Sequence, residues 1–147
     1  MTHRVFLDTS VFMYARGKEH PLKAQCGSII LQIAEKGGLG AYGSPVINTE
    51  VFQEILYRYW MINRKETGIA VCRDIRALDM TVLPITSTDA DRMCDLFEKY
   101  RKKNLPPRDL IHAAVMLSNG ISRIITADRH FDSIREVTRI SPADMRF

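Results

Sequence analysis

The sequence is poor in cysteine and has no long uncharged apolar run. Its three cysteines, Cys26, Cys72 and Cys94, are far apart and form no Cys-x-x-Cys pair. All three fall in segments with helical periodicity, so we expect buried free thiols in a reducing compartment. No segment approaches the roughly 20 apolar residues of a membrane span, and no apolar region typical of a signal peptide follows the N-terminus. We therefore expect a soluble, cytoplasmic protein.

Several motifs of nucleotide-binding and serine-dependent enzymes are also missing. Neither Gly-x-x-x-x-Gly-Lys-Ser/Thr nor Gly-x-Gly-x-x-Gly occurs, which argues against a P-loop and a dinucleotide site. No cysteine and histidine cluster has zinc spacing, and Ser10 and Ser44 lack the context of a nucleophile elbow. His112 lies on an apolar helix face, which favours a structural histidine over a catalytic one.

The composition fits one folded domain with a mild basic excess. The chain has 147 residues, of which 46% are hydrophobic and 26% charged, enough to bury one core in a single domain over residues 1–147. The net charge is +4 and the sequence pI is about 9.1. This excess favours a polyanionic partner, although a basic protein without such a partner has the same composition.

Apolar runs and helical periodicities alternate along the chain. Strands are expected at 5–7, more weakly at 39–42, and at 81–85, 121–127 and 137–140. Helices are expected at 11–15, 21–36, 48–62, 66–78, 87–103 and 108–117, with a turn and a short helix at 128–132. This order predicts an α/β fold with a mainly parallel sheet between two layers of helices.

Four carboxylates lie at the boundaries of these elements. Asp8 follows the first strand, Glu50 opens the 48–62 helix, Asp109 opens the helix after Pro107, and Asp128 follows the 121–127 strand. Taken singly, each has a structural explanation as a turn residue or as an acid at a helix N-terminus. Together they should converge, because open α/β sheets place ligands at the carboxyl ends of their strands.

Carboxylates brought together repel one another and usually need a compensating cation. Their oxygen ligands suit Mg²⁺ or Mn²⁺, ions that activate water and stabilise the charge of an in-line phosphoryl displacement. We therefore predict that Asp8, Glu50, Asp109 and Asp128 are metal-binding and catalytic, and that an activated water attacks a phosphodiester. No side-chain nucleophile is then required.

Four segments resemble, in order and spacing, the motifs of PIN-domain nucleases. They are Phe6-Leu7-Asp8-Thr9-Ser10, Asn48-Thr49-Glu50-Val51, Arg108-Asp109-Leu110-Ile111-His112-Ala113-Ala114 and Ile125-Thr126-Ala127-Asp128-Arg129-His130-Phe131. The resemblance covers nearly the whole chain and is closest to the VapC-type toxins of prokaryotic toxin–antitoxin pairs. It implies a three-layer, PIN-like fold with about five strands and Mg²⁺- or Mn²⁺-dependent endoribonuclease activity. It also implies an RNA substrate and often a homodimer neutralised by a small antitoxin.

By position, the resemblance assigns the family's acids to Asp8, Glu50, Asp109 and Asp128, of which the last is the most variable. Ser10 and Thr126 match neighbouring hydroxyl positions that can hold a carboxylate or a water. Asp132 is a further supporting candidate, although a solvated or capping role fits it better. Glu54 fits a surface position or one behind the acids. No acid of the family pattern is missing.

Cations on both sides of the acids are candidates for binding RNA phosphates. They are Lys99, Arg101, Lys102, Lys103, Arg108, Arg129 and His130. For any one of them, a solvated face that complements a helix dipole is an equal explanation. The aromatic residues Tyr57, Tyr59 and Trp60 fit the core or a dimer surface of their helix.

Other functions remain open at this level. A haloacid-dehalogenase-type phosphatase would need a second Asp where Ser10 stands, and a response-regulator receiver would need acids before the first strand and a later lysine. A nucleic-acid-binding or antitoxin-sequestering module without turnover is a second alternative, which metal-dependent cleavage would distinguish. A PIN nuclease of RNA processing or repair is a third, which a neighbouring antitoxin gene would distinguish.

Overall fold

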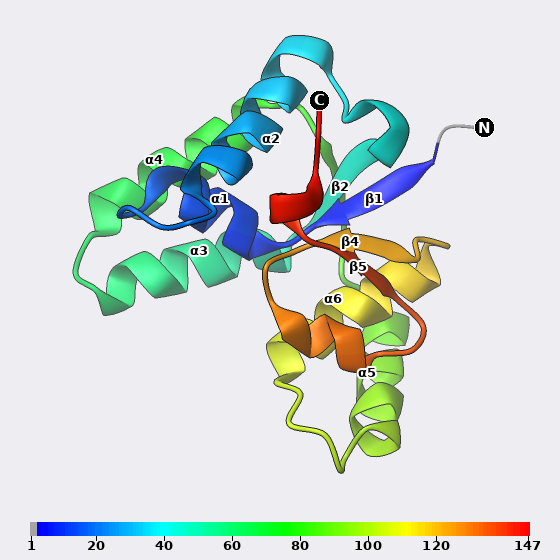
Figure 1. The fold of residues 1–147 in the computed structure, drawn as a ribbon. Coiled ribbons are helices and arrows are strands. Elements are labelled where there is room, and N and C mark those ends of the chain that lie inside the picture. Colours follow the sequence, from blue (N-terminus) through cyan, green and yellow to red (C-terminus); the bar gives the residue numbers. More distant parts are fainter. Residues whose placement is uncertain (1–2) are drawn as a thin grey trace.

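The computed structural model describes residues 3–147 and contains a five-stranded, fully parallel sheet (Figure 1). Its strands are β1 (Arg4–Leu7), β2 (Ser44–Asn48), β3 (Thr81–Leu83), β4 (Arg123–Ile125) and β5 (Thr138–Ile140), in the order β3-β2-β1-β4-β5. The predicted α/β fold with a parallel sheet of about five strands is confirmed. The first strand in the chain lies at the centre of the sheet.

Six helices of residues 3–147 cover the sheet. They are α1 (Thr9–Arg16), α2 (Lys23–Lys36), α3 (Glu50–Met61), α4 (Lys65–Ala77), α5 (Ser87–Lys99) and α6 (Pro107–Ser118), with short 3-10 turns η1 (Gly40–Tyr42), η2 (Arg129–Ser133) and η3 (Pro142–Asp144). The chain builds β1, β2 and β3 in one direction and then returns past β1 to add β4. Right-handed crossovers therefore put α1 to α4 on one face and α5, α6 and η2 on the other, as Figure 1 shows.

The innermost elements are β1 and α6. Val5, Phe6 and Leu7 of β1 are fully buried, which explains their continuous apolar run. In α6 every residue from 109 to 116 is buried, because the helix lies between the sheet and α5. Two polar residues, Asp109 and His112, are thereby taken into the interior, where each needs polar partners.

The strand predicted at 39–42 is wrong. Residues 40–42 form the 3-10 turn η1, and the strand begins at Ser44. Between them Gly43 has φ +110°, and a Cβ at this position would lie 2.7 Å from the carbonyl oxygen of His3. The strand that follows contains Pro45, but β2 pairs with β3 only from Val46 onward, so the proline removes no hydrogen bond from that ladder.

The three cysteines lie in helices, as predicted, and all are free. Cys26 is buried and Cys72 is half-buried, whereas Cys94 is exposed on α5, so the expectation of buried thiols is wrong for Cys94. None of the helices in residues 3–147 combines the length and hydropathy needed to cross a bilayer.

The start of α5 offers a test of local stability. Thr86 Oγ1 accepts a hydrogen bond from the Asp89 N–H, and the Thr86 N–H donates to the Asp89 carboxylate, which forms a capping box. We expect Thr86→Ala to lower the free energy of unfolding by about 1 kcal/mol, measured by urea denaturation. Ser87→Ala, one residue on, is the control and should change it by much less. An equal loss in both variants would contradict the assignment.

Candidate active site

Asp8 lies at the carboxyl end of β1, beside the end of β4. The chain leaves β1 toward β2 on one side, while β4 is added on the other, so this is the point where the strand order reverses. The Asp8 carboxylate is buried and accepts hydrogen bonds from Ser10 Oγ at 2.9 Å and Thr126 Oγ1 at 2.6 Å. The two hydroxyl residues therefore fix one oxygen of the carboxylate and leave the other without a hydroxyl donor.

Asp128 follows β4 and is joined to the same network. Its backbone N–H donates to Thr126 Oγ1 at 3.0 Å, and its side chain accepts from the His130 N–H at 2.9 Å. The capping role considered for Asp128 is thus present, because its carboxylate caps η2. The cap does not remove the carboxylate from the cluster, since only one of its oxygens is used.

Asp109 reaches the same place from the first turn of α6. His130 Nδ1 lies 3.0 Å from Asp109 Oδ2 and 3.0 Å from Asp128 Oδ1. Within residues 3–147, Asp109, Asp128 and His130 form a group that could hold a metal ion, with one ligand atom from each within 4.8 Å of the others. Residues from α6 and from the segment after β4 thus meet beside Asp8.

The electrostatics of the cluster favour a bound cation. Burial, followed by the negative charges of Asp128 and Asp8, raises the pKa of Asp109 to about 6 from the usual 3.8, although His130 opposes this. A divalent cation would relieve this repulsion, and the carboxylate oxygens of the cluster are ligands that Mg²⁺ and Mn²⁺ prefer. The residues present therefore fit a metal of this kind.

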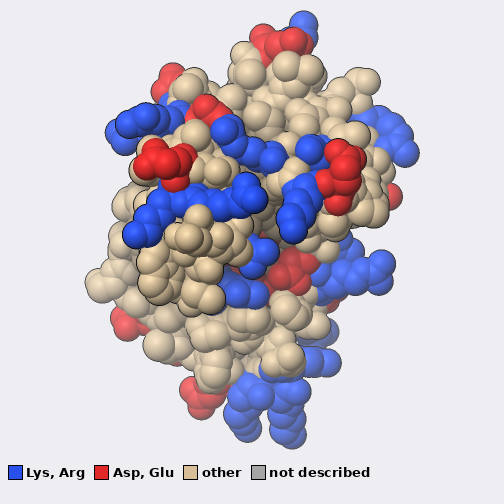
Figure 2. Space-filling view, turned by 90° about the vertical axis from the view of Figure 1, so that its left-hand side faces the viewer, with Lys and Arg blue, Asp and Glu red and all other residues tan. Residues whose placement is uncertain are grey.

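The surface around the cluster is basic. The strands in Figure 1 point to the left, and Figure 2 views the molecule from that side, onto the carboxyl ends of the strands. Figure 2 shows acidic side chains recessed near the middle of this face, with lysine and arginine side chains around them. Such an arrangement would attract a polyanion to the edge that carries the acids.

Glu50 lies in the first turn of α3, as predicted, one turn before Glu54. Burial and then the neighbouring charge of Glu54 raise the pKa of Glu50, while His112 opposes the shift. The described contacts include no donor that hydrogen-bonds to the Glu50 carboxylate, so it remains available to a ligand from the α3 side. Its backbone N–H donates to Asn48 Oδ1 at 3.1 Å.

The hydrogen bonds of His112 connect α6 with α3. Because Asn48 Oδ1 accepts from Glu50, its amide nitrogen faces His112 Nδ1 at 2.9 Å. Nδ1 therefore accepts a hydrogen bond, and the proton lies on Nε2, which faces the Glu54 carboxylate. The same Nε2 is 4.0 Å from Asp8 Oδ1. Sequence reasoning assigned His112 a structural role and did not find this pair, although Glu54 was placed behind the acids.

Other predicted residues have partners elsewhere. Asp132 is held by Arg139, with oxygen to nitrogen distances of 2.9 and 3.2 Å. Lys99 is paired with Glu136 at 3.2 Å. His130, assigned to RNA phosphates, contacts the acids themselves. Within residues 3–147, no ion pair involves Arg101, Lys102, Lys103, Arg108 or Arg129.

Comparison with known families agrees with this arrangement. The model of the PIN domain family matches residues 5–137, which include every acid of the cluster. The chain belongs to the PIN-domain family. Its relatives include a VapC ribonuclease of Mycobacterium bovis and ribonuclease VapC13 of Mycobacterium tuberculosis, each 34% identical over 93% of this chain and 99% of the relative. The resemblance seen in the sequence is confirmed.

Solved structures share the fold of this PIN domain. VapC20 of M. tuberculosis, a toxin that cleaves the sarcin–ricin loop, superposes with a TM-score of 0.72 at 13% identity, over 89% of this chain and 95% of its own. VapBC2 of Rickettsia felis, solved on a promoter DNA fragment, gives a TM-score of 0.68 at 16% identity, over 94% and 98% of the two chains. At these identities the likeness concerns the fold alone.

The raised pKa of Asp109 predicts how the stability of the metal-free PIN domain depends on pH. The folded-state pKa of about 6 exceeds the ordinary 3.8. Ionisation of Asp109 therefore lowers the free energy of unfolding by its full amount above pH 6, and this destabilisation disappears as pH falls toward 4. We expect Asp109→Asn to raise the free energy of unfolding by roughly 2–3 kcal/mol near pH 7.5 and by about half of that near pH 5.

Urea denaturation in a chelator would measure this difference at the two pH values. Asp74→Asn is the matched control, because its carboxylate forms an exposed ion pair with Arg16 at 2.7 Å. This control should change the free energy of unfolding by less than about 0.5 kcal/mol. Equal effects of Asp109→Asn at both pH values would contradict the assigned pKa.

Proposed function

We propose that this protein is a metal-dependent endoribonuclease that hydrolyses RNA phosphodiester bonds as the toxin of a toxin–antitoxin pair. The observation that carries the proposal is the meeting of Asp8, Asp109 and Asp128 at the reversal point of the sheet, in a chain 34% identical to VapC ribonucleases over nearly its whole length. Family membership supports the reaction, and the basic face around the acids supports a polyanionic substrate.

In this proposal the acids have distinct tasks. Asp8, Asp109 and Asp128 hold Mg²⁺ or Mn²⁺, with Glu50 approaching from α3. Ser10 and Thr126 keep Asp8 oriented by donating to one of its oxygens. The ion supplies activation of water and stabilisation of the charge that develops on the phosphate. The surrounding cations Lys102, Lys103, Arg108 and Arg129 hold backbone phosphates and carry no base specificity.

A partner and a second copy belong to the same proposal. VapBC proteins of Salmonella typhimurium and of Haemophilus influenzae share this fold, with TM-scores of 0.67 and 0.66. On α3, Tyr57 and Trp60 are 54% and 55% exposed with ring centres 5.8 Å apart, which is typical of a protein contact surface. We expect a homodimer through this helix and inhibition of cleavage by a small antitoxin.

Cleavage of a panel of structured and single-stranded RNAs tests the proposal. The purified protein is incubated with Mg²⁺, with Mn²⁺ or with chelator, and products are mapped at nucleotide resolution. We expect internal cuts that require the metal. Chelator-resistant cutting would overturn the metal-dependent mechanism. If every RNA of a panel that includes ribosomal and transfer RNAs stayed intact, the proposed ribonuclease activity would be overturned. Light scattering tests the dimer, and a search for a small neighbouring gene, followed by co-expression with its product, tests the antitoxin.

A further inference from the structure

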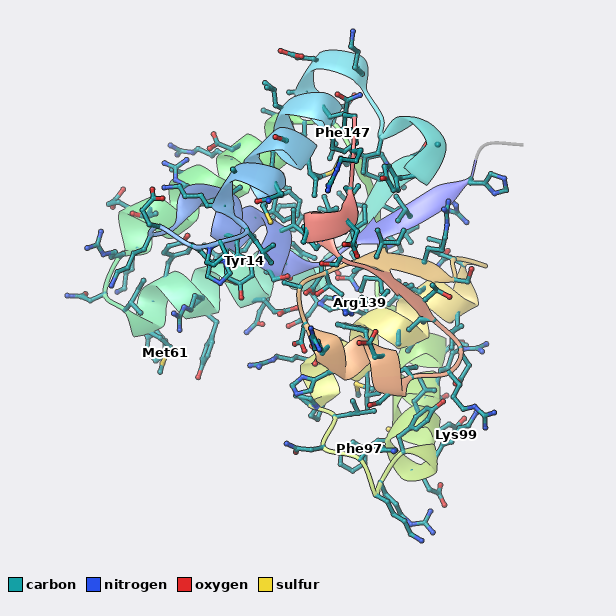
Figure 3. The ribbon with its side chains drawn as sticks, viewed as in Figure 1. Tyr14, Met61, Phe97, Lys99, Arg139 and Phe147 are labelled. Carbon is teal, nitrogen blue, oxygen red and sulfur yellow. The ribbon has the colours of Figure 1, made fainter. Side chains whose placement is uncertain are left out.

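A cavity of about 320 Å³ lies between the end of α5 and the segment that leads into α6. Its apolar wall is formed by Phe97, Tyr100, Leu105, Pro106 and Leu110. Tyr100, Leu105 and Leu110 are buried, so they give the cavity a fixed floor. Phe97 differs from them, because 51% of its side chain is exposed. Figure 3 shows Phe97 between α5 and the segment that descends from the start of α6.

The rim of this cavity is cationic, and its cations have no acidic partner within residues 3–147. Arg101 and Lys103 both line it. Arg101 donates to the carbonyl oxygen of Glu98 at 3.1 Å, which is the helix-end role considered above, and neither residue forms an ion pair with any part of residues 3–147. Lys99, two residues before Arg101, is by contrast neutralised by Glu136. An apolar cavity with unneutralised cations at its mouth suits a ligand that has an apolar face and negative charges beside it.

The cavity is directly connected to the acid cluster through the start of α6. Pro106 lines the cavity and precedes the helix, and its carbonyl oxygen accepts a hydrogen bond from the Asp109 N–H at 3.0 Å. Asp109 also directly precedes Leu110, which forms part of the cavity wall. A nucleic acid strand that continued from the cluster past the start of α6 would reach this cavity.

We propose that this cavity is a nucleobase subsite, in which a base of single-stranded RNA stacks on Phe97 while Arg101 and Lys103 bind the phosphates beside it. The identity of the ligand as RNA rests on the proposed function. Aromatic side chains stack on every base, so the subsite anchors the strand without selecting one sequence by hydrogen bonds. The unpaired cations favour this occupant over an apolar side chain of a protein partner, which would gain nothing from them.

Direct binding tests the subsite without turnover. Short fluorescent single-stranded RNAs are titrated into the full chain in chelator, with fluorescence anisotropy as the readout. We expect Phe97→Ala to weaken binding about 10-fold, Phe97→Leu to behave like Phe97→Ala, and Phe97→Trp to retain the wild-type affinity. Phe147→Ala is the matched control, since Phe147 is 56% exposed and lines a different cavity beside α2.

The salt dependence of RNA affinity in the same assay tests Arg101 and Lys103. Removing one phosphate contact to a single strand should reduce the slope of log affinity against log salt concentration by about 0.7, so Arg101→Gln and Lys103→Gln should each show this change. An RNA carrying 2-aminopurine at successive positions should show quenching at one of them that Phe97→Ala abolishes. This quenching reports stacking and does not depend on cleavage.

Several results would overturn the subsite. They are unchanged RNA affinity in Phe97→Ala, retained affinity in Phe97→Leu, or no RNA binding by the wild type. A loss of dimer in Phe97→Ala with unchanged RNA binding would instead assign the surface to a second copy. Failure of the nuclease is distinguishable, because Phe97-dependent RNA binding without metal-dependent cleavage would retain the subsite and overturn the activity.

Discussion

Asp109→Asn is expected to lower metal-dependent RNA cleavage by at least about 100-fold while the protein stays folded. Asn keeps the shape of the side chain and can still accept the hydrogen bond of His130, but it lacks the negative charge that would bind the ion. Changes in residues that only orient metal ligands already cost 10–100-fold in metal affinity or activity, so the loss of a ligand should cost no less. The variant should also lose affinity for Mn²⁺.

Single-turnover cleavage rates and calorimetric titration with Mn²⁺ measure the two effects. The Asp74 carboxylate lies on α4 and pairs with Arg16. The control variant Asp74→Asn should therefore cleave RNA and bind Mn²⁺ as the wild type does. If Asp109→Asn cleaved at the wild-type rate with the same metal dependence, Asp109 would not be a ligand. The stability measurement described above keeps this test independent of folding, because the variant is expected to be more stable without metal.

The parts of the fold that sequence reasoning recovered share a physical origin. A parallel strand covered on both faces must be apolar throughout, which makes Val5-Phe6-Leu7 recognisable as a strand. The polar residues that follow such a strand mark its carboxyl end, so Asp8 and Asp128 could be assigned to one edge. The start of α6 was visible because Asp109 opens an apolar helical run directly after two prolines, and the helix begins at the second of them, Pro107.

The strand order was harder to obtain. Local periodicity carries no information on which strands are neighbours, so the position of β1 between β2 and β4 follows only from the packed structure. The displaced second strand has a local cause. Ser44 and Pro45 have low strand propensity, and β2 tolerates the proline because β3 begins one residue later.

The contacts of the histidines could not be predicted either. His112 and Glu54 are 58 residues apart, and an apolar helix face gives no sign of a half-buried carboxylate across from it. His130 was recognised as a cation near Asp128, but its ring contacts Asp109 through the packing of η2 against α6. In both cases a histidine that looked structural or peripheral is joined to an acid from another element.

His112→Phe is expected to lower both stability and activity. The apolar ring has a similar shape and would pack near Phe6, whose ring centre lies 5.2 Å from that of His112. It would leave Asn48 Nδ2 and the Glu54 carboxylate without their present partners. Each unsatisfied buried group costs about 1–3 kcal/mol, so we expect unfolding free energy to fall by about 2–4 kcal/mol. Glu54 would then be free to leave its present place, in which His112 Nε2 holds it.

The effect of His112 variants on catalysis distinguishes a role of His112 in positioning Glu54 from a role in packing alone. His112 is fully buried and cannot contact RNA, so His112→Phe should lower kcat and Mn²⁺ affinity by about 10–100-fold with an unchanged KM for RNA. His112→Gln can still donate to Glu54 and should recover most of both. His20→Phe, at an exposed ring stacked on Tyr14, is the control. Equal losses in the Phe and Gln variants would show that the ring serves packing alone, whereas wild-type Mn²⁺ affinity in His112→Phe would show that the position of Glu54 does not affect the metal site.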